Sequence, residues 1–452
     1  MNEVTIRRRA PLRGASVEVP GDKSVTHRAL LLGGFAHGET LIVNAGGGED
    51  NLATVRALRA MGIDLGQDAA GSWRVRGSGM QPWRPPGEAL DAGNSGTTVR
   101  LLAGLLAGME IDATLDGDVS LRRRPMERVA APLRDLGFDV RTGAGGCLPM
   151  SVHAQSPARG DEDLRVVLRV ASAQVKSALL LASLRRGGVL EVVEPCATRD
   201  HTERLLRAMG VRCVSSQDYL QPGYRDSEQA PWLRLVPGGR LQGRRIEVPG
   251  DMSAAAFAWG VGLLGGAQVE VPGVGVNPGR VGLLEVWEEM GIGVNRREVR
   301  TLSSGEPAAR VGVGGASGWR GAEVAGERVA RLVDELPLLC VVAAACQGTF
   351  VLRDAAELRV KESDRIEATA ALLRSLGVGV EESQDGLRFE GLGRARWPGF
   401  RYDARGDHRM AMAAAVAAVA AEDEVVVAGA DAVSVSWPGF WEVLEILGLE
   451  VA

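Results

Sequence analysis

The hydrophobic positions along this chain follow a pattern that recurs six times. In each copy an amphipathic helix ends in Met or Leu, a glycine follows, and an apolar residue then begins a strand, as in LRAMGIDL. A glycine just past a helix readily adopts the left-handed conformation that ends it, so each copy predicts a helix, a turn and a strand. The six glycines, 71 to 86 residues apart, are Gly62, Gly137, Gly210, Gly291, Gly377 and Gly448. The pattern predicts six α/β units.

Each unit also carries a helix of small and apolar residues, such as LLAGLLAG or KSALLLASL. A helix that is apolar on all sides is buried. The longest apolar runs, Leu336–Cys346 and Ala411–Ala421, are shorter than the roughly 18 residues that a membrane crossing requires, so they predict buried helices. The GxGxxG at Gly260–Gly265 lies inside such a run, where it indicates close helix packing and not a nucleotide site.

A longer repeat divides the chain in two. VPGDKS at residues 19–24 recurs as VPGDMS at 248–253, which is 229 residues later and close to three units. The chain is therefore predicted to form two homologous halves of three units each, with a boundary near 240–250. We expect a short hinge there and a cleft between the halves, where ligands often bind.

The composition disfavours several classes of function. The 452 residues include 52 Lys plus Arg against 57 Asp plus Glu, for a net charge of −5, and only 4% are aromatic. This balance disfavours a nucleic-acid-binding protein, which usually has a basic surface and stacking aromatics. The first residues lack the apolar segment of a secretory signal. The five cysteines and five histidines show no zinc-ligand spacing, and there is no P-loop or HExxH. We expect a cytoplasmic protein with free thiols, no membrane association, no metal and no cofactor.

Polar residues gather where predicted strands give way to helices. PGDKSVTHR places Lys23 and Ser24 at a turn, with Arg28 one helical turn after Ser24, and NSGTTVR gives Gly96 and Arg100 the same spacing. Other polar residues at such junctions are Ser172, Gln174, Lys176, Lys361, Glu362, Arg365, Asp407, His408 and Arg409. Helix N-termini present free N–H groups and a partial positive charge, and added Lys or Arg makes sites for phosphates and carboxylates. The pattern indicates small, highly anionic substrates.

Pattern alone leaves other interpretations open. VKESDR also fits an exposed, charged helix face, and NSGTT also fits a polar turn with a helix cap. In TRDHTE, the spacing of Asp200 and Glu203 is typical of a capping box, while Cys196 and His201 nearby could suggest a thiol nucleophile.

Eight segments in chain order resemble one enzyme family, the 5-enolpyruvylshikimate-3-phosphate (EPSP) synthases, or 3-phosphoshikimate 1-carboxyvinyltransferases. They are PGDKSVTHRALLL, DAGNSGTTVRLL, LRRRPM, ASAQVKSALLL, TRDHTE, DELPLL, VKESDR and DHRMAM. The resemblance begins at about residue 4 and extends to the end of the chain. ASAQVKSA and DELP are similar to the bacterial branch called class II.

The resemblance implies a fold and a reaction. The fold is α/β, with two similar domains of three βαβαββ units each, the first formed by 22–247 and the second by 1–21 plus 248–452. Hinges are expected near 20–22 and 240–250. The enzyme, expected to be a monomer, would transfer the enolpyruvyl group of phosphoenolpyruvate to the 5-hydroxyl of shikimate 3-phosphate, releasing phosphate by addition and elimination through a tetrahedral intermediate. This is a step of the shikimate pathway to aromatic amino acids.

The family pattern also implies site residues. Those around phosphoenolpyruvate are Lys23, Gly96, Arg124, Gln174, Arg365 and Arg409. Those around shikimate 3-phosphate are Lys23, Ser24, Arg28, Ser172, Ala173, Gln174, Arg199, Asp334 and Lys361. Asp334 and Glu362 are the acid–base candidates, and Lys23 could share that work. Asp50 matches an acidic position of the family, and Val435 stands where some members have Lys.

Three rival functions can be weighed. A sister enolpyruvyl transferase acts on UDP-N-acetylglucosamine, but it carries a reactive Cys where this chain has DGDVSLRRRPM. A catalytically silent binding protein would have no need for the set Lys23, Arg124, Asp334, Glu362 and Arg409. An RNA 3′-phosphate cyclase would require an adenylylatable His and a basic surface, which the net charge of −5 disfavours.

Overall fold

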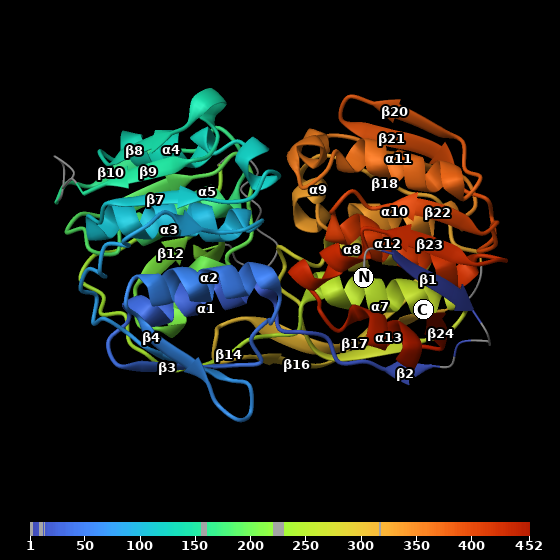
Figure 1. The fold of residues 1–452 in the computed structure, drawn as a ribbon, viewed down its shortest axis with the longest axis horizontal. Helices are drawn as coiled ribbons and strands as arrows, with labels where there is room; N and C mark the ends of the chain where they lie inside the picture. Colours follow the sequence, from blue (N-terminus) through green and yellow to red (C-terminus); the bar gives the residue numbers. More distant parts are fainter. Residues whose placement is uncertain (1–2, 9–11, 13, 155–160, 220–229, 316–317) are drawn as a thin grey trace. The chain divides into compact units, whose positions relative to one another are not determined.

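In a computed structural model, six four-stranded sheets and their helices form two compact units (Figure 1). The structure describes residues 3–8, 12, 14–154, 161–219, 230–315 and 318–452. Gly21–Val248 and Thr301–Glu306 form one unit, which we call the Lys23 unit. Met1–Pro20, Pro249–Arg300 and Pro307–Ala452 form the other, the Asp334 unit.

The Lys23 unit contains three of the sheets. The first has the order β14 (Arg245–Glu247), β3 (Glu39–Val43), β5 (Trp73–Arg76), β4 (Asp64–Gln67). The second has the order β6 (Leu90–Asp91), β7 (Ala113–Asp116), β9 (Met150–His153), β8 (Asp139–Thr142). The third has the order β10 (Leu164–Val167), β11 (Leu190–Val193), β13 (Trp232–Leu235), β12 (Cys213–Ser215). Its helices are α1 (Lys23–Phe35), α2 (Glu49–Ala60), α3 (Gly96–Met109), α4 (Glu127–Asp135), α5 (Ala173–Ala182) and α6 (His201–Ala208).

The Asp334 unit repeats this plan. Its first sheet has the order β2 (Ala15–Ser16), β15 (Val269–Gly275), β17 (Pro307–Gly314), β16 (Gly293–Thr301). The second has the order β18 (Glu323–Val324), β19 (Thr349–Leu352), β21 (Gly386–Glu390), β20 (Val380–Ser383). The third has the order β22 (Phe400–Asp403), β23 (Val425–Ala428), β1 (Glu3–Arg8), β24 (Leu449–Val451). Its helices are α7 (Met252–Gly265), α8 (Gly282–Glu289), α9 (Glu327–Leu332), α10 (Leu336–Ala344), α11 (Arg365–Ser375), α12 (His408–Ala417) and α13 (Phe440–Ile446).

Each sheet belongs to one βαβαββ unit. In the order β6, α3, β7, α4, β8, β9, the helix α3 joins two parallel strands, and β8 and β9 then pair as an antiparallel hairpin. Three sheets use a strand from a distant part of the chain, and in one of them β2 lies parallel to β15. β14 lies parallel to β3, and β1 lies antiparallel to both β23 and β24, so Glu3 faces Ala428. The predicted α/β fold of six repeat units, three in each half, is confirmed.

The six repeat glycines have the predicted conformation. All six have a positive φ, from 82° at Gly62 to 102° at Gly448. They follow the second helix of each repeat, which is α2, α4, α6, α8, α11 or α13. The glycine-ended helix inferred from the sequence therefore recurs in all six repeats.

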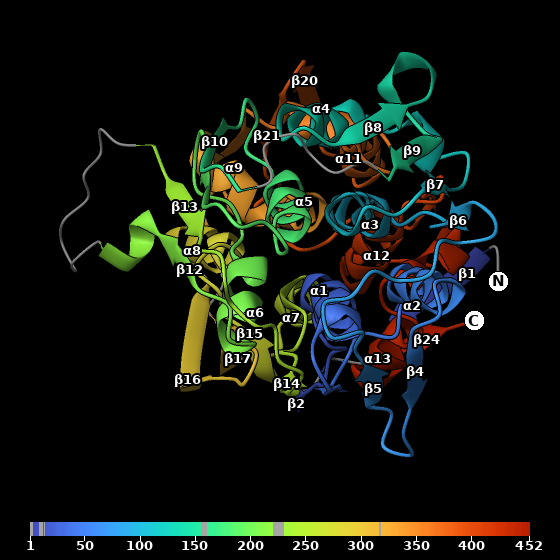
Figure 2. The ribbon, with the colours of Figure 1, turned by 90° about the vertical axis from the view of Figure 1, so that its left-hand side faces the viewer.

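The small-residue helices form the buried centre of each unit, as predicted. α1, α3 and α5 lie in the core of the Lys23 unit, and α7, α10 and α12 lie in that of the Asp334 unit. α3 and α5 pack side by side (Figure 2). A Cβ on Gly104 would lie 2.1 Å from the Ala178 carbonyl oxygen, so glycine permits this close approach. The GxGxxG of α7 is also a packing surface, since a Cβ on Gly260 would lie 2.8 Å from Leu338.

The segment Thr301–Glu306 connects β16 to β17 and packs with the Lys23 unit. The domain bounds expected from the resemblance, 22–247 and 1–21 plus 248–452, do not include this excursion. Its physical reason is a buried contact between His201 Nδ1 and Glu306 Oε1 at 2.9 Å, and a hydrogen bond of 3.1 Å from Arg204 Nη1 to the Gly305 carbonyl oxygen.

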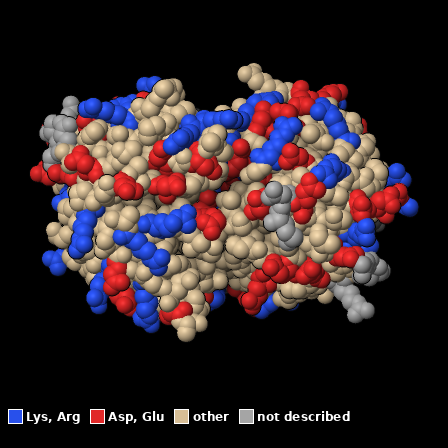
Figure 3. Space-filling view, in the orientation of Figure 1, with Lys and Arg blue, Asp and Glu red and all other residues tan. Residues whose placement is uncertain are grey.

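The charged residues of the surface and the cysteines show no specialised arrangement in the described part of the chain. Basic and acidic residues are interspersed over the face drawn in Figure 3. None of the helices in the described part of the chain combines the length and the apolar character that a membrane crossing requires. All five cysteines are free thiols.

Candidate active site

The polar segments singled out in the sequence lie at the first turns of the buried helices. Asp22 caps α1 by accepting a hydrogen bond from the Val25 amide, and Ser95 caps α3 by accepting one from Thr98. Ser172 does the same for α5, and Asp407 does so for α12. The residues that follow these caps therefore stand where backbone N–H groups and the helix dipole favour anions.

The turn before α1 requires glycine and holds Lys23 in place. A Cβ on Gly21 would lie 1.7 Å from the Asn44 carbonyl oxygen, so no other residue fits without moving the backbone. Lys23 Nζ lies 2.8 Å from Asp50 Oδ2, and the Asn51 side chain donates a hydrogen bond of 3.0 Å to the Lys23 carbonyl. These contacts connect the N-termini of α1 and α2 and aim the Lys23 ammonium group along the first turn of α2.

Arg28 is buried, and its guanidinium group connects α1 to α5 and α6. Nε donates to Thr202 Oγ1 at 2.7 Å, Nη2 to Ser177 Oγ at 2.9 Å, and Nη1 to the Ser24 carbonyl at 2.9 Å. Burial lowers the pKa of Arg28 to about 10; Glu203 opposes this change, and the positive charge of Arg199 adds to it. The carboxylates of Glu203, Asp22 and Glu306 thus act on Arg28 against burial and against the charge of Arg199.

Two arginines meet at the start of α3. A Cβ on Gly96 would lie 2.9 Å from Arg100 Nη1 and 3.5 Å from Arg124 Nη1. Arg100 Nη1 donates to Gln174 Oε1 at 2.7 Å, and the Gln174 amide donates to Thr97 Oγ1 at 3.0 Å. Two guanidinium groups at one helix N-terminus form a site for a doubly charged anion. Arg100 is absent from the family-derived set, although its spacing from Gly96 was visible in the sequence.

A buried ion cluster fixes the turn that carries Arg199. Lys176, with 2% of its side chain exposed, places Nζ 2.9 Å from Glu194 Oε2 and 2.8 Å from Glu203 Oε1. Lys176 Nζ also lies 3.5 Å from the Thr198 carbonyl oxygen. The capping box suggested by Asp200 and Glu203 is wrong, because Asp200 makes no side-chain cap and Glu203 pairs with Lys176 instead.

A chain of hydrogen-bonding side chains, one imidazole and three hydroxyl groups, connects α1, α2 and the start of α3. His27 Nδ1 lies 2.8 Å from Thr54 Oγ1, Thr54 Oγ1 lies 2.8 Å from Thr98 Oγ1, and Thr98 Oγ1 lies 2.8 Å from Ser95 Oγ. Burial lowers the pKa of His27 well below its usual range, and the positive charges of Lys23 and Arg28 add to this effect. His27 is therefore neutral and acts as a hydrogen-bonding link among the three helices.

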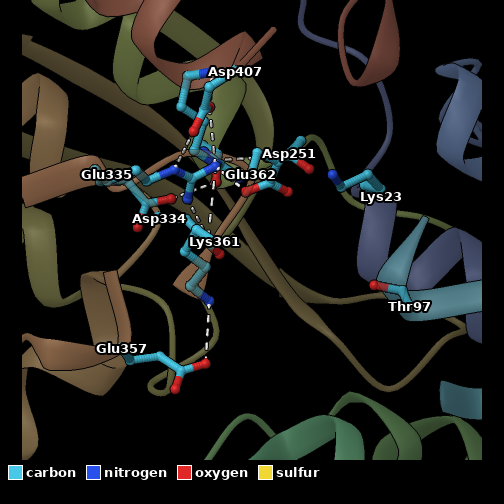
Figure 4. Close-up of polar contacts among 12 residues, drawn as sticks. Lys23, Thr97, Asp251, Asp334, Glu335, Glu357, Lys361, Glu362 and Asp407 are labelled. Carbon is cyan, nitrogen blue, oxygen red and sulfur yellow. Dashed lines mark hydrogen bonds and ion pairs between the residues drawn. The ribbon is translucent and has the colours of Figure 1, made fainter. Parts of the chain in front are cut away.

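In the Asp334 unit, Arg365 lies among three carboxylates, those of Asp334, Glu362 and Asp407. Figure 4 labels these three acidic residues. Arg365 Nε donates to Asp407 Oδ2 at 2.8 Å, and its Nη2 donates to Glu362 Oε2 at 2.6 Å. Burial opposes a charge on Arg365, but the carboxylates, Asp407 foremost, raise its pKa above the ordinary value. Burial likewise disfavours ionised Asp407, yet Arg365 holds the pKa of that carboxyl below its usual range. Both groups are ionised in the folded protein.

Asp334 lies on the turn before α10 and faces three arginines. Its carboxylate oxygens are 3.7 Å from Arg280 Nη1, 3.7 Å from Arg365 Nη1 and 3.7 Å from Arg409 Nε. Its side chain is 18% exposed. Three positive charges stabilise the ionised carboxylate, which is the form that can accept a proton.

Lys361 extends from the turn before α11, with its Nζ 3.9 Å from Glu357 Oε1 (Figure 4). Burial lowers the pKa of Lys361 below its ordinary value, while Asp334 and Glu357 counteract that effect. The Lys361 side chain is 25% exposed, so its ammonium group can contact a ligand.

The structure gathers the predicted site residues into two groups. One group, at helix N-termini of the Lys23 unit, comprises Lys23, Ser24, Arg28, Gly96, Arg124, Ser172, Ala173, Gln174 and Arg199. The other, in the Asp334 unit, comprises Asp334, Lys361, Glu362, Arg365 and Arg409. Val435 ends the short helix Ala430–Val435. Arg280, His27 and Thr54 were missed because each is separated from its partners by many positions. Within the described ranges, no cluster of His, Cys, Asp and Glu is suited to a metal ion.

Comparisons with known proteins agree on one family. The family model for EPSP synthase (3-phosphoshikimate 1-carboxyvinyltransferase) matches residues 6–444. A 3-phosphoshikimate 1-carboxyvinyltransferase from Synechococcus sp. (strain RCC307) is 44% identical, with 95% of each chain covered. The EPSP synthase structure from Acinetobacter baumannii has a TM-score of 0.84 and 36% identity, with all of both chains covered. The enolpyruvyl transferase NikO from Streptomyces tendae, at 18% identity and a TM-score of 0.78 over 100% of this chain and 98% of that one, shares the fold.

Proposed function

Because this chain belongs to the EPSP synthase family, the 3-phosphoshikimate 1-carboxyvinyltransferases, we propose that the cations at its helix N-termini bind the phosphates and carboxylates of the family's two substrates. The enzyme transfers the enolpyruvyl group of phosphoenolpyruvate to shikimate 3-phosphate in the shikimate pathway. Each substrate carries one phosphate and one carboxylate. Four anionic groups therefore require neutralisation before the reactants can approach each other.

The phosphoenolpyruvate ligands are proposed to be Lys23, Gly96, Arg124, Gln174, Arg365 and Arg409. The position of Gly96 supports this assignment, because the guanidinium groups of Arg100 and Arg124 both approach it. Phosphate oxygens would accept hydrogen bonds from these forks and from the free amides at the start of α3. We add Arg100 to the set as the residue that orients Gln174, since it donates to the Gln174 amide oxygen.

The shikimate 3-phosphate ligands are proposed to be Lys23, Ser24, Arg28, Ser172, Ala173, Gln174, Arg199, Asp334 and Lys361. The support is that Arg28 and Arg199 lie near each other while the first turn of α5 begins at Ala173. A phosphate beside this turn would relieve the repulsion between the two arginines.

Asp334 and Glu362 are the proposed acid and base, with Lys23 sharing the work. The base accepts the proton of the 5-hydroxyl as its oxygen bonds to C2 of phosphoenolpyruvate, and the acid protonates C3. The tetrahedral intermediate then loses a proton from C3 as the bond to phosphate breaks and the double bond re-forms. One carboxylate must be ionised at the start, and the three arginines 3.7 Å from Asp334 favour that form.

The observation that carries the proposal is the pair of guanidinium groups at Gly96. The test is a phosphate-release assay on the purified protein, with each substrate alone and with both. Release only when phosphoenolpyruvate and shikimate 3-phosphate are both present is expected. Turnover with UDP-N-acetylglucosamine in place of shikimate 3-phosphate, and none with the latter, would reject it in favour of the sister activity.

We also propose that the enzyme works as a monomer in a reducing compartment, the cytoplasm. The five free thiols support the compartment, because disulfides are typical of oxidising ones. Light scattering on the purified protein should give one chain mass, 47.7 kDa. A mass twice as large would replace the monomer with a dimer.

A further inference from the structure

The second copy of the repeated motif, VPGDMS, plays a different part from the first. In the first copy Ser24 follows the capped turn of α1 and is a proposed substrate ligand. In the second copy Ser253 occupies the same place at the start of α7, after the cap Asp251. Ser253 Oγ donates to Glu335 Oε1 and accepts a hydrogen bond of 2.7 Å from Arg280 Nη2. The serine of the second copy therefore belongs to a buried cluster of protein side chains.

Arg280 is the cation of that cluster. It is 4% exposed and lies on the turn before α8. The turn is fixed by Asn277, whose carbonyl accepts from the Arg280 amide at 2.7 Å and whose side chain accepts from the Gly279 amide at 2.8 Å. Arg280 Nη2 lies 3.3 Å from Glu335 Oε1, and Nη1 lies 3.7 Å from Asp334 Oδ2. One guanidinium group thus contacts two consecutive carboxylates.

Those two carboxylates need a permanent counter-charge. Glu335 is fully buried and Asp334 is adjacent to it on the same turn, so the two negative charges repel each other in a poorly solvated place. A buried carboxylate without a partner is strongly unfavourable. The other two arginines at Asp334 have further tasks: both Arg365 and Arg409 are proposed phosphoenolpyruvate ligands, and Arg365 already binds Asp407.

We propose that Arg280 is a positioning residue for catalysis: through Ser253 and Glu335 it holds the turn before α10 and orients the Asp334 carboxylate while Arg365 and Arg409 bind phosphoenolpyruvate. This inference rests on the proposed role of Asp334. It gives the repeated motif in the Asp334 unit a task, because Ser253 connects the cap of α7 to the carboxylate pair.

The test compares steady-state kinetics of Arg280→Gln and Arg280→Lys with the wild type. Arg280→Gln should lower kcat about tenfold to a hundredfold, because a small displacement of a reacting group has effects of that size. The KM values for both substrates should stay near those of the wild type, since Arg280 is not a ligand. Arg280→Lys should restore part of kcat, because Lys supplies the charge but not the fork. Unchanged kcat, or raised KM with unchanged kcat, would overturn the proposal.

A double-mutant cycle separates this inference from the proposed function. If Arg280 acts through Asp334, then adding Arg280→Gln to Asp334→Asn should cause little further loss of kcat. Losses that multiply would show that Arg280 acts elsewhere and would overturn the inference alone. Near-normal turnover of Asp334→Asn by itself would instead remove Asp334 from catalysis, which contradicts the proposed function.

Two further variants guard against a simple folding defect. Arg280→Gln combined with Glu335→Gln removes the uncompensated buried charge and should restore thermal stability but not kcat. Full recovery of kcat in this pair would mean that Arg280 only neutralises Glu335, and the positioning role would be wrong. The matched control is Arg328→Gln, which breaks a more exposed ion pair with Glu289 in the same unit and should leave kcat unchanged. A loss of kcat there equal to that of Arg280→Gln would also overturn the proposal.

Discussion

The two compact units share one fold, but they differ in the charged side chains that lie near the starts of their helices. In the Lys23 unit the proposed binding and orienting residues include Lys23, Arg28, Arg100, Arg124 and Arg199, and Asp50 pairs with Lys23. In the Asp334 unit, Arg280, Lys361, Arg365 and Arg409 are matched by Asp334, Glu335, Glu362 and Asp407. The proposed site residues of the Lys23 unit include four cations and no carboxylate, whereas those of the Asp334 unit combine cations with Asp334 and Glu362.

The difference follows from what each group has to do. Cations bind substrate anions most strongly where few protein carboxylates compete for them, although the helix dipole itself disfavours a cation at an N-terminus. Carboxylates that transfer protons need cations beside them to set their ionisation and their orientation. Duplicated scaffolds therefore diverge by changing the residues after the helix caps, as Lys23 and Met252 illustrate at equivalent places in the two motif copies.

The largest expected effect comes from the acid–base group of the Asp334 unit. Asp334→Asn should lower kcat about 10²- to 10⁴-fold, the usual contribution of general acid–base catalysis. Both dissociation constants should change little, because the Asn amide oxygen can still accept a hydrogen bond from the ligand. Asp50→Asn in the Lys23 unit should cost less in kcat and more in affinity, because Asp50 holds Lys23. Stopped-flow phosphate release and equilibrium fluorescence titration measure the two quantities. Equal losses of kcat in both variants would break the comparison.

The ion pairs around Arg365 in the Asp334 unit should contribute strongly to the free energy of unfolding. Asp407→Asn removes a fully buried partner of Arg365, and breaking such a buried pair costs about 3–5 kcal/mol of unfolding free energy. The unfolding free energy is measured by urea denaturation followed by circular dichroism. Glu367→Gln, which breaks an exposed pair with Arg405, is the control and should hardly change it. A small effect of Asp407→Asn would show that Glu362 alone neutralises Arg365.

A methyl group at Gly96 tests the proposed phosphoenolpyruvate site of the Lys23 unit. The Cβ of Gly96→Ala would lie 2.9 Å from Arg100 Nη1, so the guanidinium group has to move. Crowding of this kind costs roughly 1–3 kcal/mol, which predicts an increase of about tenfold or more in the KM for phosphoenolpyruvate. The KM for shikimate 3-phosphate should change little. Equal increases for both substrates would contradict the separate assignment.

The smallest expected effect is a pH dependence of stability in the Lys23 unit. His27 has a pKa well below its usual range, so below about pH 6.5 the unfolded chain binds a proton that the folded chain does not. Stability should be greatest above that pH and fall by up to about 1.4 kcal/mol per pH unit below it. His27→Asn keeps a hydrogen-bonding group for Thr54 and should flatten this dependence between pH 5 and 7. Unfolding curves at several pH values test it, and an unchanged slope would assign the dependence to another group.

Much of the fold was visible in the sequence because its signals are local. The six glycines recur with the same positive φ, so a single turn conformation identifies each repeat. The apolar helices also needed no tertiary information, since their composition alone predicts burial. By contrast, the excursion of Thr301–Glu306 depends on Glu306 meeting His201 more than a hundred residues away, and no short pattern encodes such a contact.

The site was predictable only where a motif is continuous. Lys23, Ser24 and Arg28 belong to one segment, and the structure confirms that they lie within the first two turns of α1 after the cap. The resemblance to a family supplied their roles, which remain proposals. Arg280 lies in a segment with no other polar side chain but Asn277 nearby, and its partners lie on α7 and before α10. Only the three-dimensional arrangement shows why that arginine is buried.

The pairing of β1 with β23 and β24 has a consequence for biosynthesis. Val425–Ala428 is synthesised about 420 residues after Glu3–Arg8, which takes roughly 20–90 s at typical translation rates. All of Gly21–Val248 is made in that interval. Gly21–Val248 can thus fold during synthesis, while the backbone of β1 has not yet paired with β23. A chaperone that shields β1 in the nascent chain would protect it from pairing with a neighbouring molecule.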